Sequence, residues 1–310
     1  MRRKPVNLPA SIAAGLRRIA REKGTDTAFL LRRYAIERLL YRLSLSPHRN
    51  AFILKGAMLF TAWLDDPFRP TQDLDLLGLG DHSLKAITNM FRGICSAGVE
   101  DDGLRFDVAH LNATAIREDQ NYGGVRVKTV AYLGKARIPV QVDIGFGDAV
   151  TPAAVEIEFP TLFDGPSLLL ASYPRETVVA EKFEAMVKLG QANSRMKDYY
   201  DILALAQLFP FEGQLLADAF RATFARRKTE LPSGVPAGLS DAFGEDALKI
   251  AQWAGFTGRA ALPIPPGTLR DAVGAIRAFI MPPALAAREG DIFASIWYRQ
   301  GPWQEKAELP

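Results

Sequence analysis

Two aspartates separated by one residue, Asp73 and Asp75, are the clearest chemical signal in the chain. Residues 73–77 alternate polar and apolar side chains as a half-buried strand does, and residues i and i+2 of a strand point to the same face. Two carboxylates held so close repel each other unless a cation lies between them. Such hard oxygen ligands suit Mg²⁺, which proteins commonly bind through one or two carboxylates together with substrate phosphates. The alternative is an exposed strand face with two solvated aspartates.

A second candidate lies upstream, where the apolar run 52–54 is followed by Lys55 and Gly56. A strand that ends in glycine and leads into a helix lets backbone N–H groups approach a phosphate closely, and Lys55 could add a positive charge. The alternative is a plain strand-to-helix turn.

A lysine within the amphipathic helix predicted after Pro174 is a third candidate. Lys182 lies four residues after Val178 and four before Met186, which places it on the apolar face of the helix. A lysine directed inward needs a partner, and a triphosphate would serve; the alternative is that its end reaches back to the surface.

The next predicted helix, with Ser194 as its N-cap, carries Asp198 and Asp201. Each acid lies four residues before an apolar residue, so both continue the buried face. The structural alternative is that they stabilise the first turns of the helix through its dipole, with a Lys197–Asp201 pair.

Together these residues resemble the abortive-infection nucleotidyltransferase family (AbiEii/AbiGii toxins), which belongs to the polymerase-beta-like nucleotidyltransferases. The resemblance runs from about Ser11 to about Leu208 and is carried by Lys55-Gly56 and by Arg69-x-Thr71-x-Asp73-x-Asp75. It implies that Lys55, Gly56, Arg69 and Thr71 contribute to substrate binding. The chain departs from the family pattern at Ala57, where the family has a Gly or Ser that helps to grip the nucleotide phosphates.

The resemblance also implies a third carboxylate on a later strand. Asp143 interrupts the apolar strand 140–144 and is preferred over Asp107, while Asp148 is interpreted as a turn residue. Three converging carboxylates could hold two Mg²⁺ ions that activate the attacking oxygen and stabilise the leaving pyrophosphate. The family has a lysine at the position of Lys182 and a run similar to Arg195-x-Lys197-Asp198-x-x-Asp201 near its active centre. Asp198 is then expected to orient Lys182 or to contact the substrate.

The function implied is a Mg²⁺-dependent nucleotidyltransferase that moves a nucleoside monophosphate from an NTP onto an acceptor. By resemblance the acceptor is RNA, such as the 3′ end of a tRNA, and the protein is a toxin with a cognate antitoxin partner. The alternatives are transfer to a protein or a small molecule, a catalytically idle binding protein that keeps the fold, and a magnesium nuclease. We expect Lys182 to lie near the metal site, and Lys182→Ala to impair NTP use far more than folding.

The elements that must position these residues predict an α+β fold. Residues 1–50 have helical periodicity, residues 57–64 and 83–97 are predicted helices with Ser83 as an N-cap, and alternating strands follow over 104–108, 125–130 and 138–144. Pro139 restricts its strand to an edge or a start. From Pro174 onward the pattern is helical. We predict a polymerase-beta-like nucleotidyltransferase core with a mixed sheet in residues 1–165 and a helical domain in residues 166–310.

Composition sets broad limits. The chain has 310 residues, 48% of them hydrophobic, a net charge of +3 and one cysteine, Cys95, which excludes an internal disulfide and a cysteine-based metal site. The three histidines show no metal-binding spacing. No stretch approaches the roughly eighteen apolar residues of a membrane span, and no signal peptide follows the basic start, so a cytoplasmic protein is expected. Basic clusters, interpreted as solvated helix faces or a phosphate-facing surface, occur at 2–4, 17–18, 32–33 and 226–228.

Overall fold

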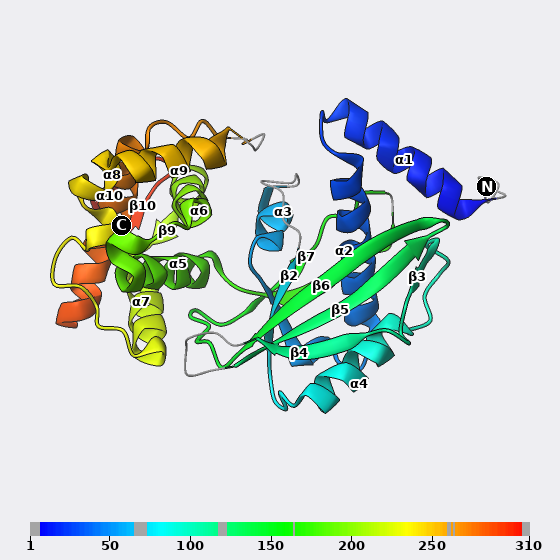
Figure 1. Ribbon diagram of the computed structural model, residues 1–310. Helices are drawn as coiled ribbons and strands as arrows, with labels where there is room; N and C mark the ends of the chain where they lie inside the picture. Colours follow the sequence, from blue (N-terminus) through cyan, green and yellow to red (C-terminus); the bar gives the residue numbers. More distant parts are fainter. Residues whose placement is uncertain are drawn as a thin grey trace, which may run out of the picture. The chain divides into compact units, whose positions relative to one another are not determined.

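The computed structural model describes residues 7–64, 73–116, 123–163, 165–258, 262 and 264–305 (Figure 1). The chain divides into two compact units, each made of two segments. Unit 1 comprises residues 1–147 and 156–172, and unit 2 comprises residues 148–155 and 173–310. Among the described residues, no helix is both long enough and apolar enough to cross a lipid bilayer.

Unit 1 is built on a mixed sheet that has eight strands in the described part of the chain. These are β1 (Phe52–Lys55), β2 (Leu74–Gly78), β3 (Leu104–Phe106), β4 (Asn112–Ile116), β5 (Gly124–Leu133), β6 (Ala136–Phe146), β7 (Val155–Glu158) and β8 (Leu169–Ser172). Their order is β3-β5-β6-β2-β1-β8-β7, with β4 paired to β5. Because β2 runs parallel to β6 and antiparallel to β1, the predicted mixed sheet is confirmed.

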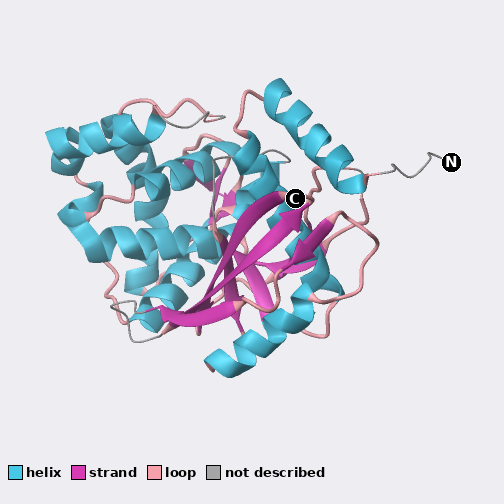
Figure 2. Ribbon diagram, turned by 45° about the vertical axis from the view of Figure 1, so that its right-hand side comes forward, coloured by secondary structure: helices cyan, strands magenta, loops and turns pink. Residues whose placement is uncertain are grey.

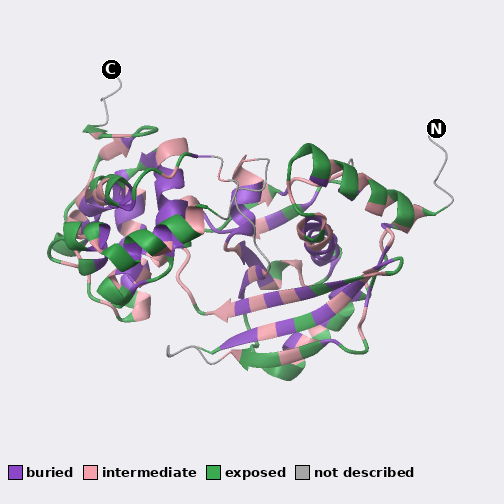
Figure 3. Ribbon diagram, turned by 45° about the horizontal axis from the view of Figure 1, so that its top comes forward, coloured by how far each residue is buried: buried purple, intermediate pink, exposed green. Residues whose placement is uncertain are grey.

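Alternate residues of β5 and β6 are buried, and the residues between them are half-buried or exposed (Figure 3). This period of two is the signal that predicted both strands from the sequence. Strand β4 was not predicted, because its residues Asn-Ala-Thr-Ala-Ile carry too little apolar alternation. Both strands therefore present one buried, apolar face and one more polar face.

Pro139 lies within β6 at a place where, among the described residues, the strand pairs only with β5. It is opposite Val130 of β5, whereas the pairing of β6 with β2 begins only at Val142, opposite Leu74. A proline, which cannot donate a backbone hydrogen bond, is tolerated at such an edge. The predicted edge position is thus observed, and β6 extends beyond the start of β2.

The described part of unit 1 also contains helices, which are drawn in cyan together with those of unit 2 in Figure 2. They are α1 (Leu8–Glu22), α2 (Thr27–Leu45), α3 (Met58–Leu64) and α4 (Leu84–Cys95), with a short 3₁₀ turn η1 (Arg49–Ala51) after α2. α2 packs against β6, and α4 packs against β4 and β5. The Ser83 hydroxyl accepts a hydrogen bond from the Ala86 N–H, so the predicted N-cap of α4 is confirmed.

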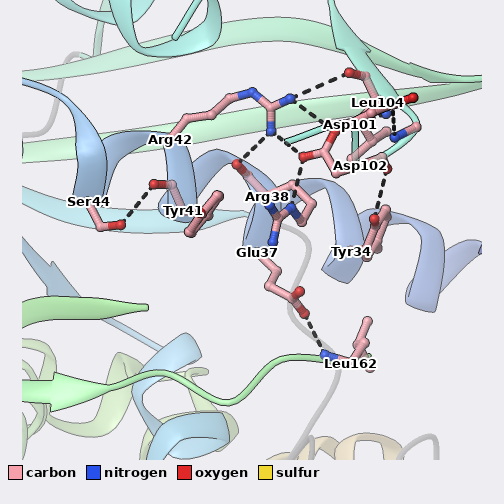
Figure 4. Close-up of polar contacts among 11 residues, drawn as sticks. Tyr34, Glu37, Arg38, Tyr41, Arg42, Ser44, Asp101, Asp102, Leu104 and Leu162 are labelled. Atoms are coloured by element: carbon pink, nitrogen blue, oxygen red, sulfur yellow. Dashed lines mark hydrogen bonds and ion pairs between the residues drawn. The ribbon is translucent and has the colours of Figure 1, made fainter. Parts of the chain in front are cut away.

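A buried ion-pair network ties α2 to the segment before β3 (Figure 4). Arg42 binds both carboxylate oxygens of Asp102, with Nη1–Oδ2 and Nη2–Oδ1 distances of 2.6 and 3.1 Å, and Arg38 Nε lies 2.8 Å from Oδ2. Tyr34 donates to the Asp102 carbonyl. Burial opposes ionisation of Asp102, but the two guanidinium groups hold the pKa of its carboxyl below the ordinary value. One carboxylate therefore pairs with two buried arginines.

Replacing Asp102 with asparagine should destabilise the protein by about 3 kcal/mol or more, because it leaves two buried guanidinium groups without a counter-charge. The adjacent exposed residue supplies the control: Asp101→Asn should change the free energy of unfolding by less than about 1 kcal/mol. Urea denaturation at neutral pH measures both. Equal stability of the two variants would show that the network is not a major source of stability.

Unit 2 is mainly helical, as predicted. Its helices are α5 (Arg175–Leu189), α6 (Met196–Leu208), α7 (Gly213–Arg227), α8 (Asp241–Glu245), α9 (Ala247–Thr257) and α10 (Leu269–Glu289), with 3₁₀ turns η2 (Gly190–Ala192) and η3 (Ala237–Leu239). Helix α5 begins at Arg175, and Pro174 is its N-cap.

The prediction of an all-helical second domain missed a small sheet in unit 2. It consists of β9 (Phe211–Glu212), β10 (Ser295–Trp297) and β11 (Trp303–Glu305) in the order β11-β10-β9. The rings of Trp297 and Trp303 lie 5.0 and 5.9 Å from that of Phe279 in α10. Strands of two or three residues are too short to show an alternation of apolar and polar residues. Their packing against aromatic side chains cannot be predicted from such a pattern.

The basic cluster at 226–228 does not form a single solvated or phosphate-facing surface. Arg227 is directed into unit 2, where it lies 3.0 Å from each of Glu181 and Glu184 and 3.4 Å from Asp148. Burial disfavours the charge of Arg227, but these carboxylates raise its pKa above the ordinary value. Asp148, interpreted from the sequence as a turn residue, is thus an ion-pair partner that connects residues 148–155 to the helices.

Candidate active site

A row of four charged residues crosses the sheet of unit 1 at one register. Asp75 of β2 lies opposite Lys55 of β1 on one side and beside Asp143 of β6 on the other, and Asp143 lies opposite Arg126 of β5. All four side chains are half-buried, while their neighbours along these strands are mostly buried. The order of charges is therefore positive, negative, negative, positive on a single face of the sheet. The register places two of the predicted carboxylates side by side.

Arg126 was not predicted from the sequence, although it holds Asp143 directly. Its Nε and Nη2 atoms lie 2.8 and 2.7 Å from the two carboxylate oxygens, and Gln141 Nε2 lies 3.4 Å from Oδ2. The hydrogen bonds to Asp143 raise the pKa of Arg126, with further contributions from Asp73 and Asp75. The available signal was an arginine on an alternating strand, but its pairing with Asp143 requires the register of β5 and β6.

Asp73 lies one residue before β2 and lines a pocket on unit 1. Within the described ranges, no three His, Cys, Asp or Glu residues form a group arranged to hold a metal ion. The carboxylate oxygens present are the donors that Mg²⁺ prefers, so the chemistry of the donor set fits the ion. For Asp143 to act as a third metal ligand, its carboxylate would have to release the Arg126 guanidinium and bind the metal instead.

The turn after β1 brings backbone against the carboxylate of Asp75. Gly56 has a φ of +73°, and a Cβ added there would lie 2.1 Å from Asp75 Oδ2. Any side chain at this position would both strain the backbone and displace the carboxylate. The glycine of the predicted phosphate-binding turn is therefore also the residue that makes room for Asp75.

Gly56→Ala should weaken binding of Mg²⁺–NTP and destabilise the protein more than Gly24→Ala does. Gly24 is the matched control, because its φ is +61° and a Cβ there would meet nothing within 4 Å. The left-handed backbone costs about 1–2 kcal/mol in either variant, and only Gly56→Ala adds the clash with Asp75. Urea denaturation and binding of Mg²⁺–NTP measure the two effects. Identical behaviour of the variants would contradict the close approach.

The predicted residues of unit 2 form a buried cluster between α5 and α6. Lys182 Nζ lies 2.6 Å from Asp198 Oδ1 and 2.8 Å from Asp201 Oδ2, and Arg195 Nε binds the other oxygen of Asp198. Both aspartates are 1% exposed or less. The expectation that the acids continue the buried face is met. The predicted N-cap Ser194 is one residue early, because Arg195 occupies that position before Met196.

Lys182 thus has partners within the chain, which changes the expected effect of removing it. Burial opposes ionisation of Asp198, but Lys182 and Arg195 hold the pKa of its carboxyl well below the ordinary value. Lys182→Ala would leave two buried carboxylates poorly compensated, and we therefore expect it to affect folding as well as NTP use.

Lys182→Met should destabilise the protein by about 3–5 kcal/mol at pH 7, since it breaks a buried ion-pair cluster by removing one partner. The difference from wild type should shrink as the pH falls towards the ordinary carboxyl pKa of about 4. In wild type the depressed pKa of Asp198 gives stability that is present above its unfolded-state pKa and is lost on acidification. The variant lacks the Lys182 charge, the strongest of the interactions that lower the pKa of Asp198, so it should lose less stability than wild type on acidification.

Urea denaturation between pH 7 and pH 4 tests this expectation. The control is Lys188→Met on the exposed side of α5, which should alter stability little at any pH. A pH-independent difference between wild type and Lys182→Met would contradict the assignment of the effect to the carboxylates.

Two predicted substrate-binding residues, Arg69 and Thr71, lie outside the described residues. The rival carboxylate Asp107 follows β3, and both β5 and β6 lie between β3 and β2. Its side chain accepts from the backbone N–H of His110 and lies 3.0 Å from that imidazole. The sheet therefore brings Asp143, and not Asp107, beside Asp75.

The mixed sheet carries a glycine turn, an Asp-x-Asp strand and a further aspartate on the parallel neighbouring strand. This arrangement is expected of a nucleotidyltransferase. The chain belongs to the family described as nucleotidyl transferase AbiEii toxin of type IV toxin–antitoxin systems, whose model matches residues 38–278. This confirms the family predicted from the sequence. The match includes both the row of charges in unit 1 and the Lys182 cluster in unit 2.

Two solved structures from Helicobacter pylori are also similar to the chain, each with 14% sequence identity. JHP933 aligns over 84% of this chain and 92% of its own with a TM-score of 0.47. A protein described as a candidate nucleotidyltransferase aligns over 85% of this chain and 98% of its own with a TM-score of 0.48. No curated protein sequence matches the chain significantly.

Proposed function

We propose that this protein transfers a nucleoside monophosphate from a Mg²⁺-bound NTP to an acceptor hydroxyl. The observation that supports the proposal best is the adjacent pair Asp75 and Asp143, with the Gly56 turn packed against Asp75. Two neighbouring carboxylates on one face create a site for a divalent cation, and the turn supplies backbone N–H groups for phosphates.

In the proposed reaction the acceptor oxygen forms a bond to the α-phosphorus, and the bond from that phosphorus to the bridging oxygen breaks. Pyrophosphate leaves, and the hydroxyl proton passes to solvent. Asp73 and Asp75 would hold the metal, with Asp143 as a third ligand. When bound, Mg²⁺ neutralises charge on the phosphates.

The remaining predicted residues keep the roles implied by the family. Gly56 and Lys55 would bind phosphates, and Arg69 and Thr71 would contact the nucleotide. Lys182, Asp198 and Asp201 would contribute to substrate binding and catalysis. The family supports an antitoxin partner, and RNA, including tRNA, is the acceptor that we propose.

A second candidate function is a nucleotidyltransferase fold that binds ligands without catalysis. The bidentate Arg126–Asp143 pair favours it, because a guanidinium occupies both oxygens of the proposed third ligand. The two functions differ in whether added Mg²⁺ and NTP produce a covalent product. A magnesium nuclease would consume RNA without releasing pyrophosphate from NTP.

Asp73→Asn should reduce Mg²⁺-dependent transfer of label from α-labelled NTP to RNA by about 10²-fold or more, because a metal ligand loses its charge. Asp291→Asn, which neutralises an exposed acid of unit 2, is the control and should retain wild-type activity. The fold of both variants is checked by thermal denaturation. Equal transfer by Asp73→Asn and wild type, or no transfer by wild type with any of the four NTPs, would overturn the catalytic proposal in favour of the binding protein.

A further inference from the structure

The face of the sheet that carries the two carboxylates also carries a set of cations. On β5, β6 and β3, residues of this face alternate with buried ones, and the register brings Lys128 opposite Gln141 and Tyr132 opposite both Arg137 and Arg105. Lys128, Arg137 and Arg105 are exposed. This face is therefore basic beyond the Asp75–Asp143 pair.

A pocket of about 420 Å³ opens on this basic region. Its lining includes Asp73, Gln141, Arg32 of α2, Lys128 of β5 and Arg137 of β6. It lies where β6 continues past Leu74, the first described residue of β2 that pairs with it. The volume falls within the roughly 300–1,000 Å³ of ordinary ligand sites.

The charges around this pocket are not compensated by the part of the chain that the structure describes. Within that part, Arg32, Lys128 and Arg137 have no ion-pair partner, and Asp73 is the only acid that lines the pocket. Arg126 on the same face differs, because Asp143 neutralises it. Three cations around one cavity repel one another and favour an anionic ligand. Arginine and lysine together are the usual partners of phosphate oxygens.

We propose that this pocket binds a phosphate of a polynucleotide acceptor, next to the hydroxyl that attacks the NTP. The inference rests on the proposed function, and the order of strands supports it. Gly56, the proposed triphosphate site, follows β1 on one side of Asp75, whereas the pocket lies on the other side, towards β6 and β5. An in-line displacement needs the attacking and leaving oxygens on opposite sides of the phosphorus. If the triphosphate binds at Gly56, the basic pocket lies on the side from which the acceptor strand would approach.

The test uses the full chain and the double variant Lys128→Ala/Arg137→Ala. The probe is a short fluorescein-labelled single-stranded RNA, whose dissociation constant is measured by anisotropy over a range of salt concentrations. Lys85→Ala/Arg92→Ala is the matched control, because it removes two exposed cations from α4, on the helix that packs against β4 and β5. Binding of each Mg²⁺–NTP is measured separately by calorimetry.

The pocket variant should bind the RNA about tenfold or more weakly, and the slope of log K against log salt should fall by about 1.4, as expected for two lost contacts to a single strand. Its affinity for NTP should stay within about twofold of wild type, and the control should resemble wild type in both assays. RNA binding equal to that of wild type, or no RNA binding by wild type, would overturn the proposal. Loss of NTP binding with intact RNA binding would assign the pocket to the triphosphate instead.

These binding assays need no turnover, so they separate this inference from the proposed function. A wild type that transfers label, together with a pocket variant that binds RNA normally, would refute the pocket assignment alone. A wild type that binds RNA through the pocket but transfers nothing would refute the catalytic proposal alone.

Discussion

The candidate site of unit 1 depends on the strand register, which holds two mutually repelling carboxylates side by side. Asp75 and Asp143 occupy the same register on parallel strands, and the strands outside them place Lys55 and Arg126 at the two ends of the row. Four strands must keep their register at once, since a shift of one residue would move a charge to the apolar face. The buried alternation of β5 and β6 opposes such a shift, so hydrophobic packing on one face fixes the electrostatics of the other.

Each unit holds two neighbouring aspartates, but the two pairs differ in burial and in the cation that contacts them. In unit 2 the single ammonium group of Lys182 contacts both Asp198 and Asp201, which are almost completely buried. In unit 1 the guanidinium of Arg126 contacts Asp143 in a site that is half-buried. In the first arrangement both carboxylates are shielded from solvent. The second remains accessible, so an arriving cation competes with one arginine and not with a complete cage.

Much of this could be predicted from the sequence, for reasons tied to particular residues. The spacing of Asp73 and Asp75 and the alternation of β5 and β6 are local patterns, as is the position of Lys182 between Val178 and Met186. The pairing of Arg126 with Asp143 and of Arg38 and Arg42 with Asp102 is different, since it depends on residues 17 and about 60 positions apart. Likewise, Gly56 was predicted as a phosphate-binding residue, but its role in making room for Asp75 requires the antiparallel β1–β2 pair.

The path of the chain between the units has a consequence for synthesis. The sheet of unit 1 includes β8, which pairs in parallel with β1, so more than one hundred positions separate these partners along the chain. A nascent chain that has emerged only as far as β6 already contains Asp75, Asp143 and Arg126, yet β1 still lacks its second neighbour. Residues 148–155 emerge before the helices of unit 2 that they join, among them α7 with Arg227. The first segment of unit 2, residues 148–155, is therefore synthesised before β8, the last strand of unit 1. Neither unit can be completed during translation before the chain has passed residue 172.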